Sequence, residues 1–390
     1  MICWILSKAN SNSPKHAIRL ITVCFSLQIL IEMVTEFKNK KIAAIYTVLP
    51  PHEVDFMDEV GNYDFTELQM KKLKKVMGFG TRRVAAKGDT VGDYAIQAVD
   101  QMLKDGIFKE SEIGAIIVTT TSPDHFIPPI SNIVQGKFDF DEDTVCIDIS
   151  QGCCGYPVGL TYAFMTLDAQ KDKKVLLIAG DMLSHRVSER DRASRPITGD
   201  AVTVSLIENS DNGKPVWCSL KNDGKDAFAV YIPAGGSRME ITPETTKEEE
   251  DEFGNWRGKQ HLVMQGDLVF NIIINMTPVM MEELLSKSGD KMDDIDYFVC
   301  HQSSSFTLKK LAQRLEVTEE RLPRDIVPKY GNSSSATIPV TMCEHVNEFF
   351  ADGKKKKFMF AAFGTGMSLG AVLMELNKPI CKLMDYKQNS

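Results

Sequence analysis

The chain has 390 residues, of which 43% are hydrophobic and 25% are charged, and its formal net charge is −8 at pH 7. This composition is sufficient for two substantial cores, and the negative charge argues against a general nucleic-acid-binding protein. The nine cysteines show neither zinc-type spacing nor the dense framework of small secreted proteins. We therefore expect a reducing compartment, the cytoplasm, and no metal.

An apolar run at residues 20–31 follows Lys8, Lys15 and Arg19. The pattern resembles a signal peptide or a short anchor, but it is too short for a transmembrane helix and no Ala-x-Ala cleavage site follows it. We expect no stable membrane span. Residues 1–37 are interpreted as an N-terminal extension, either an upstream mis-assigned start or an amphipathic helix that contacts a membrane.

From residue 38 onwards, strand-like and helix-like apolar patterns alternate along the chain. In residues 38–210, strands are expected at 41–48, 115–121, 144–149 and 175–180, with helices at 91–104 and 158–170. In residues 211–390, strands are expected at 296–300 and 358–362, with helices at 268–287, 307–315 and 336–349. The alternation predicts two α/β halves with largely parallel sheets, joined at a polar turn near residue 210.

Cys153 lies in a turn with Gly152 and Gly155, after one expected strand and before one expected helix. This places its sulfur near a helix N-terminus, where free N–H groups and the helix dipole favour thiolate over thiol. A thiolate is the nucleophile in covalent acyl transfer. The alternative for a cysteine considered alone is a small buried side chain.

Two further segments carry polar groups suited to the same chemistry. His301 follows an expected strand, and Asn332 lies in a turn of small residues that opens an expected helix. A glycine-rich bend at residues 361–370 contains Gly364 and Gly366. Each segment alone is a weak signal. Together, cysteine, histidine and asparagine in this order predict a catalytic set.

These segments resemble the ketoacyl-ACP synthase III family of the thiolase superfamily, over roughly residues 38–378. Two more blocks carry the resemblance: residues 78–83 are similar to the family's Gly-Ile-x-x-Arg segment, and residues 119–128 to its Thr-Thr-Ser-Pro-Asp loop. The resemblance implies a thiolase-like fold, with two similar βαβαβ halves in a five-layer αβαβα arrangement. It also implies a homodimer and no cofactor.

The resemblance implies a mechanism in two stages. Cys153 would form an acyl-enzyme from an acyl-CoA or acyl-ACP donor, with the backbone N–H groups of Cys153 and Gly366 as the oxyanion hole. Malonyl-ACP would then lose CO₂, and His301 and Asn332 would stabilise the resulting enolate. Decarboxylative Claisen condensation with the acyl group would yield a 3-oxoacyl-ACP.

The resemblance also suggests residues for substrate selection. Phe126 and Ile127 would belong to a loop that reaches into the partner subunit and closes the acyl tunnel, and Ile127 in place of a Phe favours a chain longer than acetyl. Relatives that use acetyl-CoA carry a Trp and an Arg where Lys72 and Val76 stand here, so a carrier-bound donor becomes more plausible. The expected positions for docking CoA or an acidic carrier are Lys72, Lys75, Arg82, Lys309 and Lys310.

Two alternatives remain open. Some relatives transfer the acyl group to oxygen or nitrogen, typically after loss of the asparagine or alteration of the histidine. A non-catalytic partner subunit of a ketosynthase heterodimer would lack the nucleophile. The presence of Cys153, His301 and Asn332 favours condensation over both.

Overall fold

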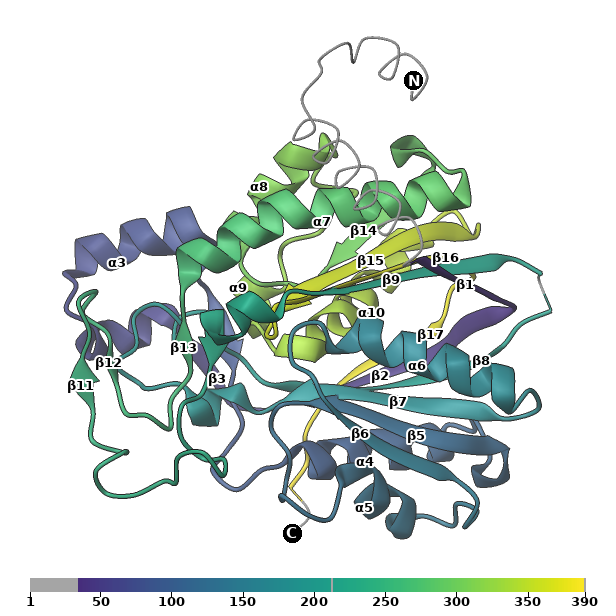
Figure 1. Ribbon diagram of the computed structural model, residues 1–390, viewed down its shortest axis with the longest axis horizontal. Coiled ribbons are helices and arrows are strands. Elements are labelled where there is room, and N and C mark those ends of the chain that lie inside the picture. Colours follow the sequence, from purple (N-terminus) through teal and green to yellow (C-terminus); the bar gives the residue numbers. More distant parts are fainter. Residues whose placement is uncertain (1–33, 212, 389–390) are drawn as a thin grey trace, which may run out of the picture.

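The computed structural model describes residues 34–211 and 213–388 (Figure 1). The interpretations of residues 1–33 as a mis-assigned start or an amphipathic helix lie outside this range. The last residues of the expected extension do belong to the fold, because β1 (Val34–Lys38) pairs with β9 (Pro215–Asn222) and its Phe37 is buried in the core.

The first sheet has six strands in the order β17-β2-β8-β7-β5-β6. Its strands are β2 (Lys40–Leu49), β5 (Ile113–Thr120), β6 (Val145–Ser150), β7 (Lys174–Asp181), β8 (Ala201–Asn209) and β17 (Ile380–Asp385). The second sheet has the order β1-β9-β16-β15-β14, with β14 (Tyr297–Cys300), β15 (Lys356–Gly364) and β16 (Ser368–Leu376). The division at residue 210 therefore falls between β8 and β9, but β1 and β17 each join the sheet of the other half.

The expectation of largely parallel sheets holds for the first sheet, in which β17–β2, β7–β5 and β5–β6 are parallel, and is wrong for the second. In the first sheet, β8 is antiparallel to both of its neighbours, β2 and β7. In the second sheet, only β14 and β15 form a parallel pair. The missing helical crossovers explain this difference, since β15 and β16 are joined by a tight bend, which allows only antiparallel pairing.

Helices separate and cover the two sheets (Figure 1). Between them lie α6 (Gly155–Ala169) and α10 (Thr337–Phe349), whereas α4 (Val91–Lys104) and α5 (Ile130–Lys137) pack on the outer face of the first sheet. The outer face of the second sheet is covered by α7 (Gly266–Ser288) and α8 (Ser305–Leu315). This arrangement confirms the five-layer αβαβα fold.

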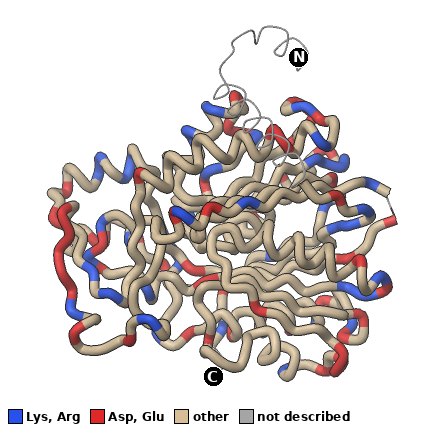
Figure 2. Tube along the Cα trace, viewed as in Figure 1, with Lys and Arg blue, Asp and Glu red and all other residues tan. Residues whose placement is uncertain are grey.

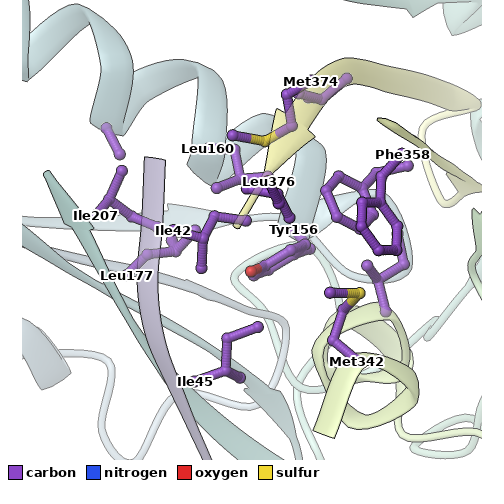
Figure 3. Close-up of a cluster of buried hydrophobic side chains, with 14 of the residues drawn as sticks. Ile42, Ile45, Tyr156, Leu160, Leu177, Ile207, Met342, Phe358, Met374 and Leu376 are labelled. Atoms are coloured by element: carbon purple, nitrogen blue, oxygen red, sulfur yellow. The ribbon is translucent and has the colours of Figure 1, made fainter. Parts of the chain in front are cut away.

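The largest core cluster lies between the sheets, around α6 and α10 (Figure 3). Tyr156 and Leu160 of α6 pack with Met342 of α10 and with Phe358 of the second sheet. Gly159 lets α6 approach the first sheet closely, because a β-carbon there would clash with the Leu177 side chain. Burial of such side chains contributes about 25 cal/mol per Å² of apolar surface. The two sheets therefore share one continuous interior.

Most of the shorter elements lie on the side of the molecule that carries Cys153. They are β3 (Glu53–Asp55), η1 (Phe56–Asn62), α3 (Glu67–Leu73), the π-helical turn η2 (Lys74–Gly78), β4 (Thr81–Arg83), η4 (Leu183–Arg186), η5 (Gly224–Ala229), β10 (Val230–Tyr231), β11 (Glu249–Glu250), β12 (Trp256–Arg257), β13 (Val263–Met264), α9 (Val327–Tyr330) and η7 (Ser334–Ala336). Most of this side comes from residues 53–83 and 224–264, which lie far apart in the sequence. Two further turns, η3 (Glu110–Glu112) and η6 (Met292–Asp294), precede β5 and β14 at the opposite ends of these strands.

Helix α7 is the one helix within residues 34–211 and 213–388 that is long and apolar enough to cross a membrane. It packs on β9, β15 and β16 and buries Met280, Met281 and Leu284 against them. Its apolar character is therefore accounted for, at least in part, by the core of the second sheet.

Candidate active site

Cys153 occupies the predicted turn between a strand and a helix. β6 ends at Ser150 and α6 begins at Gly155, whose N–H donates to the Gly152 carbonyl at 2.6 Å. A β-carbon at position 155 would lie 2.8 Å from the Cβ of Ser335, so glycine is needed for the turn to fit against η7. The turn thus holds Cys153 against the second half of the chain.

Cys153, His301 and Asn332 line the same cavity, which has a volume of about 920 Å³. They come from the β6–α6 turn, the C-terminal end of β14 and the segment between α9 and η7. The structure therefore brings together the three residues expected to act together. Much of the remaining wall is apolar, with Phe65, Met77, Phe79, Met264, Phe270 and Phe306 among its side chains.

His301 is fixed at the end of β14. Its backbone N–H donates to the Ala361 carbonyl at 2.8 Å, its Nδ1 lies 2.7 Å from Thr337 Oγ1, and Phe363 packs against the ring at 5.6 Å between centroids. Burial lowers the pKa of His301 to about 3, although a hydrogen bond to the Ser334 backbone opposes this shift. The imidazole is therefore neutral at physiological pH.

Asn332 is held by its own turn. Its Oδ1 accepts a hydrogen bond from the Ser334 N–H at 2.9 Å, and its Nδ2 lies 3.5 Å from the Ser303 carbonyl. The preceding Gly331 has φ +84° and packs on Gly199, where a β-carbon would not fit. This orientation leaves amide N–H capacity on Nδ2 for a group in the cavity.

The environment of Cys153 does not lower the pKa of its thiol. Burial raises that pKa to about 11, outweighing the hydrogen bonds from the Ser334 hydroxyl and from the Cys153 backbone, which lower it. Burial of the sulfur therefore opposes the effect expected of the helix N-terminus, because the charged thiolate loses more hydration than the thiol. Burial thus favours the neutral forms of both Cys153 and His301.

The glycine-rich bend between β15 and β16 faces Cys153 through residues other than the expected one. Gly364 and Thr365 line the cavity, whereas Gly366 is exposed and has φ +126°, and a β-carbon at position 366 would clash with the Ser368 hydroxyl. The assignment of Gly366 to the oxyanion hole stays a prediction, and Thr365 is a second candidate because it lines the cavity. The backbone near the sulfur is that of Gly364 and Thr365, because the chain turns away from the cavity at Gly366.

Arg82 cannot contact a carrier or CoA. Its side chain is fully buried, forms an ion pair with Glu59 at 2.6 Å and donates to the Arg195 carbonyl at 2.6 Å. Burial of a guanidinium is tolerated only with such partners. The structural role of Arg82 is therefore to join β4 to η1 and to the segment before β8.

The other four expected docking residues are exposed. Lys72 and Lys75 lie on α3 and η2, and Lys309 and Lys310 lie on α8, with Lys310 at the edge of the cavity. Figure 2 shows lysines along α3 at the same end of the molecule as the acidic β11. The lysines thus stand on two elements that flank the cavity, α3–η2 and α8.

Phe126 and Ile127 do not line this cavity. They project from the loop after β5 and are 87% and 84% exposed. Within one subunit they therefore form no acyl tunnel. Such exposure is unusual for large apolar side chains.

Sequence reasoning missed three buried polar residues behind the catalytic set. Asp181, at the end of β7, accepts hydrogen bonds from the Thr121 N–H at 2.6 Å and from the hydroxyls of Thr120, Thr121 and Ser122, which fixes the loop beside Cys153. Ser334 Oγ lies 3.9 Å from Cys153 Sγ, and Thr337 contacts His301. The available signals were an aspartate after a buried strand and the hydroxyl-rich run at residues 333–337.

All seven cysteines in the described part of the chain are free. Within the same residues, no cluster of three or more His, Cys, Asp or Glu side chains could hold a metal ion. That the enzyme needs neither metal nor cofactor stays a prediction.

Comparison with known proteins agrees with the geometry. The family model for 3-oxoacyl-[acyl-carrier-protein] synthase III matches residues 147–224, which include Cys153. The model for the C-terminal part of the same family matches residues 285–376, which include His301 and Asn332.

Relatives are similar over most of their length. A putative 3-oxoacyl-[acyl-carrier-protein] synthase 3 of Campylobacter jejuni is 29% identical over 88% of this chain and 95% of its own. A beta-ketoacyl-[acyl-carrier-protein] synthase III of Koribacter versatilis is 29% identical over 87% and 98%. The crystal structure of a 3-oxoacyl-(acyl-carrier protein) synthase from Burkholderia xenovorans superimposes with a TM-score of 0.83 at 25% identity, covering 90% of this chain and 99% of the other. The two family models, the relatives and the fold together indicate the 3-oxoacyl-ACP synthase III family of condensing enzymes, which have the thiolase-like fold.

Proposed function

We propose that this protein is a condensing enzyme that forms a 3-oxoacyl-ACP from an acyl thioester and malonyl-ACP. The observation that carries the proposal is the convergence of Cys153, His301 and Asn332 on one largely apolar cavity. These residues supply a nucleophile, a proton acceptor and an amide donor, which are the groups that two-stage thioester chemistry requires.

In the first stage, Cys153 attacks the acyl thioester and the tetrahedral intermediate carries an oxyanion. The backbone N–H group of Cys153 is one proposed donor to this oxygen, and that of Gly366 or Thr365 is the other. One such donor contributes about 3 kcal/mol to transition-state stability in comparable sites. The product of this stage is an acyl-enzyme at Cys153.

In the second stage, malonyl-ACP binds in the cavity and loses CO₂. His301 and Asn332 stabilise the enolate by hydrogen bonds to the thioester oxygen. The enolate carbon attacks the acyl carbonyl, and the Cys153 sulfur leaves. Carboxylate loss is favoured where water is largely absent, which agrees with the apolar wall of the cavity.

The carrier is expected to dock where lysines flank the cavity. The two flanking elements expose four lysines, Lys72, Lys75, Lys309 and Lys310. Acidic carriers are attracted to such positive patches. Names of the relatives refer to acyl-carrier proteins, in agreement with this partner.

The protein is proposed to act as a homodimer in the cytoplasm. β6 is an edge strand whose Val145 and Ile147 are 38% and 40% exposed, and the adjacent helix α6 exposes Tyr162 and Met165. An exposed apolar edge strand is normally covered. Pairing of two such edges would also bury Phe126 and Ile127, which we propose line the acyl tunnel of the partner and leave room for a chain longer than acetyl.

The test is intact-protein mass spectrometry after incubation with a panel of acyl-CoAs and acyl-ACPs, followed by malonyl-ACP. An adduct on Cys153 that malonyl-ACP discharges as a 3-oxoacyl-ACP supports the proposal and identifies the primer. The matched controls are Cys153→Ala, which should form no adduct, and Cys154→Ala, which should still form one. An adduct that only an alcohol or amine discharges would indicate acyl transfer, and the absence of any adduct would indicate a non-catalytic subunit.

A further inference from the structure

Helix α9 is bound to α10 by one carboxylate. Glu344 of α10 accepts hydrogen bonds from Lys329 Nζ at 2.8 Å and from the Tyr330 hydroxyl at 2.7 Å. Lys329 and Tyr330 are the last two residues of α9, and Gly331 alone separates them from Asn332. Burial raises the pKa of Glu344, but the two hydrogen bonds outweigh this effect and lower it, so the carboxylate is ionised. The Asn332 turn is therefore tied to α10.

His345, the next residue of α10, forms a second connection to the same segment. Its Nε2 lies 2.8 Å from Asp325 Oδ1, and its Nδ1 lies 2.8 Å from Glu348 Oε2. An ionised carboxylate can only accept, so both contacts are satisfied when both ring nitrogens carry hydrogen. Asp325 precedes α9 and also forms an ion pair with Lys329 at 2.7 Å. The imidazolium thus holds the start of α9, as Glu344 holds its end.

The first turn of α10 contacts the other residue proposed to stabilise the enolate. Thr337, the first residue of α10, lies 2.7 Å through its Oγ1 from His301 Nδ1. Glu344 and His345 follow about two turns further along the same helix. Two groups that act on one oxygen must keep a fixed separation, and a displacement near 1 Å costs about 10²-fold in rate. One helix therefore supports both His301 and Asn332.

Asn332 is also supported by the first half of the chain. Its N–H donates to the Ile197 carbonyl at 2.6 Å, and its carbonyl accepts from the Gly199 N–H at 3.1 Å. His301, in contrast, follows β14 in the second sheet. On that side, Asn332 Nδ2 reaches the Ser303 carbonyl only at 3.5 Å, the long end of the hydrogen-bond range. The shorter side-chain contacts on that side are those of α9 with α10.

We infer that Glu344 and His345 are positioning residues that hold α9 against α10 and so keep Asn332 at the distance from His301 that condensation needs. The inference rests on the proposed function for its catalytic meaning. It assigns a role in the second stage to two residues that do not line the cavity. Acyl loading at Cys153 does not use Asn332 and is therefore independent of the α9–α10 contacts.

One of the α9–α10 contacts titrates. Burial lowers the pKa of His345, but the hydrogen bonds from its ring to Asp325 and Glu348 outweigh burial and raise it. The other charged groups nearby are Glu344 and Lys329, which pair with each other. Because the pKa in the folded state lies above the ordinary value of 6.5, the imidazolium contact is complete below pH 6.5 and is lost as the pH rises through the raised pKa. The Glu344 contacts remain, so alkaline pH should loosen α9 without releasing it.

The test compares Glu344→Ala, which removes both bonds to α9, with Glu344→Gln, which keeps an oxygen acceptor and the shape of the side chain. Tyr330→Phe removes one bond and no charge. The matched control is Asp352→Ala, which removes an ion pair with Lys356 just beyond the end of α10.

Three quantities are measured for each variant. Hydrogen–deuterium exchange of peptides that cover residues 325–332 reports how firmly α9 and the Asn332 turn are held. Single-turnover assays give the rate of Cys153 acylation by an acyl-CoA and the rate at which malonyl-ACP discharges the adduct.

Glu344→Ala should exchange faster at residues 325–332 and discharge at least about tenfold more slowly, with the loading rate unchanged. Glu344→Gln and Tyr330→Phe should show smaller effects of the same kind, and Asp352→Ala should show none. A folded Glu344→Ala with wild-type exchange and discharge would overturn the inference, and so would equal losses of loading and discharge. If Glu344→Ala fails to fold, wild-type exchange and discharge in Tyr330→Phe would overturn it.

His345→Gln tests the titrating contact. In wild type, the ratio of the discharge rate to the loading rate should fall between pH 6 and pH 9, relative to the same ratio in His345→Gln. The midpoint should match the pKa of His345 measured by ¹⁵N NMR, with His345→Gln identifying the signal. A His345 pKa below 6.5, or parallel pH profiles, would overturn the role of His345. If wild type loads no acyl group, the proposed function fails, but exchange and NMR still decide whether these contacts hold the turn.

Discussion

Gly364 and Cys153 face each other so closely that position 364 has no room for a side chain. A β-carbon there would clash with the Cβ of Cys153 and lie 3.2 Å from its sulfur. Gly364 ends β15 in the second sheet, and Cys153 follows β6 in the first. The nucleophile is therefore clamped between the two halves of the chain, and its position depends on both.

Gly364→Ala is expected to displace Cys153 and to lower acyl loading by about two orders of magnitude or more, since a shift near 1 Å at a reacting atom has this effect. Overpacking should also reduce the free energy of unfolding by about 1–3 kcal/mol. Mass spectrometry of the acyl adduct and chemical denaturation measure the two effects. Gly136→Ala in α5, where a β-carbon meets nothing within 4 Å, is the control. Wild-type loading by a folded Gly364→Ala enzyme would contradict the clamp.

Asn332→Ala is expected to separate the two stages. Acyl loading should persist, because Asn332 acts on the enolate, whereas the rate of 3-oxoacyl-ACP formation should fall by about 10²–10³-fold, as for loss of one oxyanion donor. Quenched-flow assays of adduct formation and of adduct discharge give the rates of acyl loading and of condensation. Asn377→Ala, at an exposed position between β16 and β17, controls for general effects. A loss of loading equal to the loss of condensation would show that Asn332 positions Cys153 instead.

The reactivity of Cys153 toward iodoacetamide should rise with pH. Burial raises the pKa of its thiol to about 11, so the thiolate fraction grows about tenfold per pH unit from pH 7 to pH 10 and levels off only above the pKa. Alkylation is followed by peptide mass spectrometry, with circular dichroism at each pH to verify folding. A rate that already levels off near pH 7 would mean a thiolate at rest, and would contradict the role of desolvation described here.

Ile147→Lys should disrupt the proposed dimer. The substitution places a charge on the exposed edge of β6, and two copies would face each other across a symmetric interface, which is a natural way to prevent edge pairing. Sedimentation velocity should show monomers and acyl loading should fall. Ile380→Lys is the matched control, since Ile380 is 55% exposed on β17, the opposite edge of the same sheet. Dimer loss with Ile380→Lys and not with Ile147→Lys would move the interface to the other edge.

Local sequence patterns were sufficient to predict the helices and strands that are amphipathic or uniformly buried. Residues 91–104 were expected to form a helix and do so as α4, because Thr90 and Asp93 form a capping box at its start. The strands β8 and β9 were missed. Both strands are as buried as the predicted ones. Their places in the sheets depend on antiparallel pairing with β2 and β16, which lie elsewhere in the chain.

The chemistry of the site was predictable in part. Cys153, His301 and Asn332 follow recognisable local signals, and the structure brings them to one cavity. The burial of Arg82 was not predictable, because its partner Glu59 is 23 positions away and neither residue is distinctive alone. The raised pKa of Cys153 depends on how much protein surrounds the sulfur, which helix position does not determine.

The exchange of β1 and β17 between the two sheets has a consequence for how the protein unfolds. Each half lacks a strand that only the other half's segment supplies, so neither residues 34–211 nor 213–388 can complete a sheet independently. Loss of either half would expose an unpaired strand edge and the apolar faces that now meet around α6 and α10. The two repeats therefore act as one thermodynamic unit, and the catalytic cavity at their junction is retained or lost together with the whole fold.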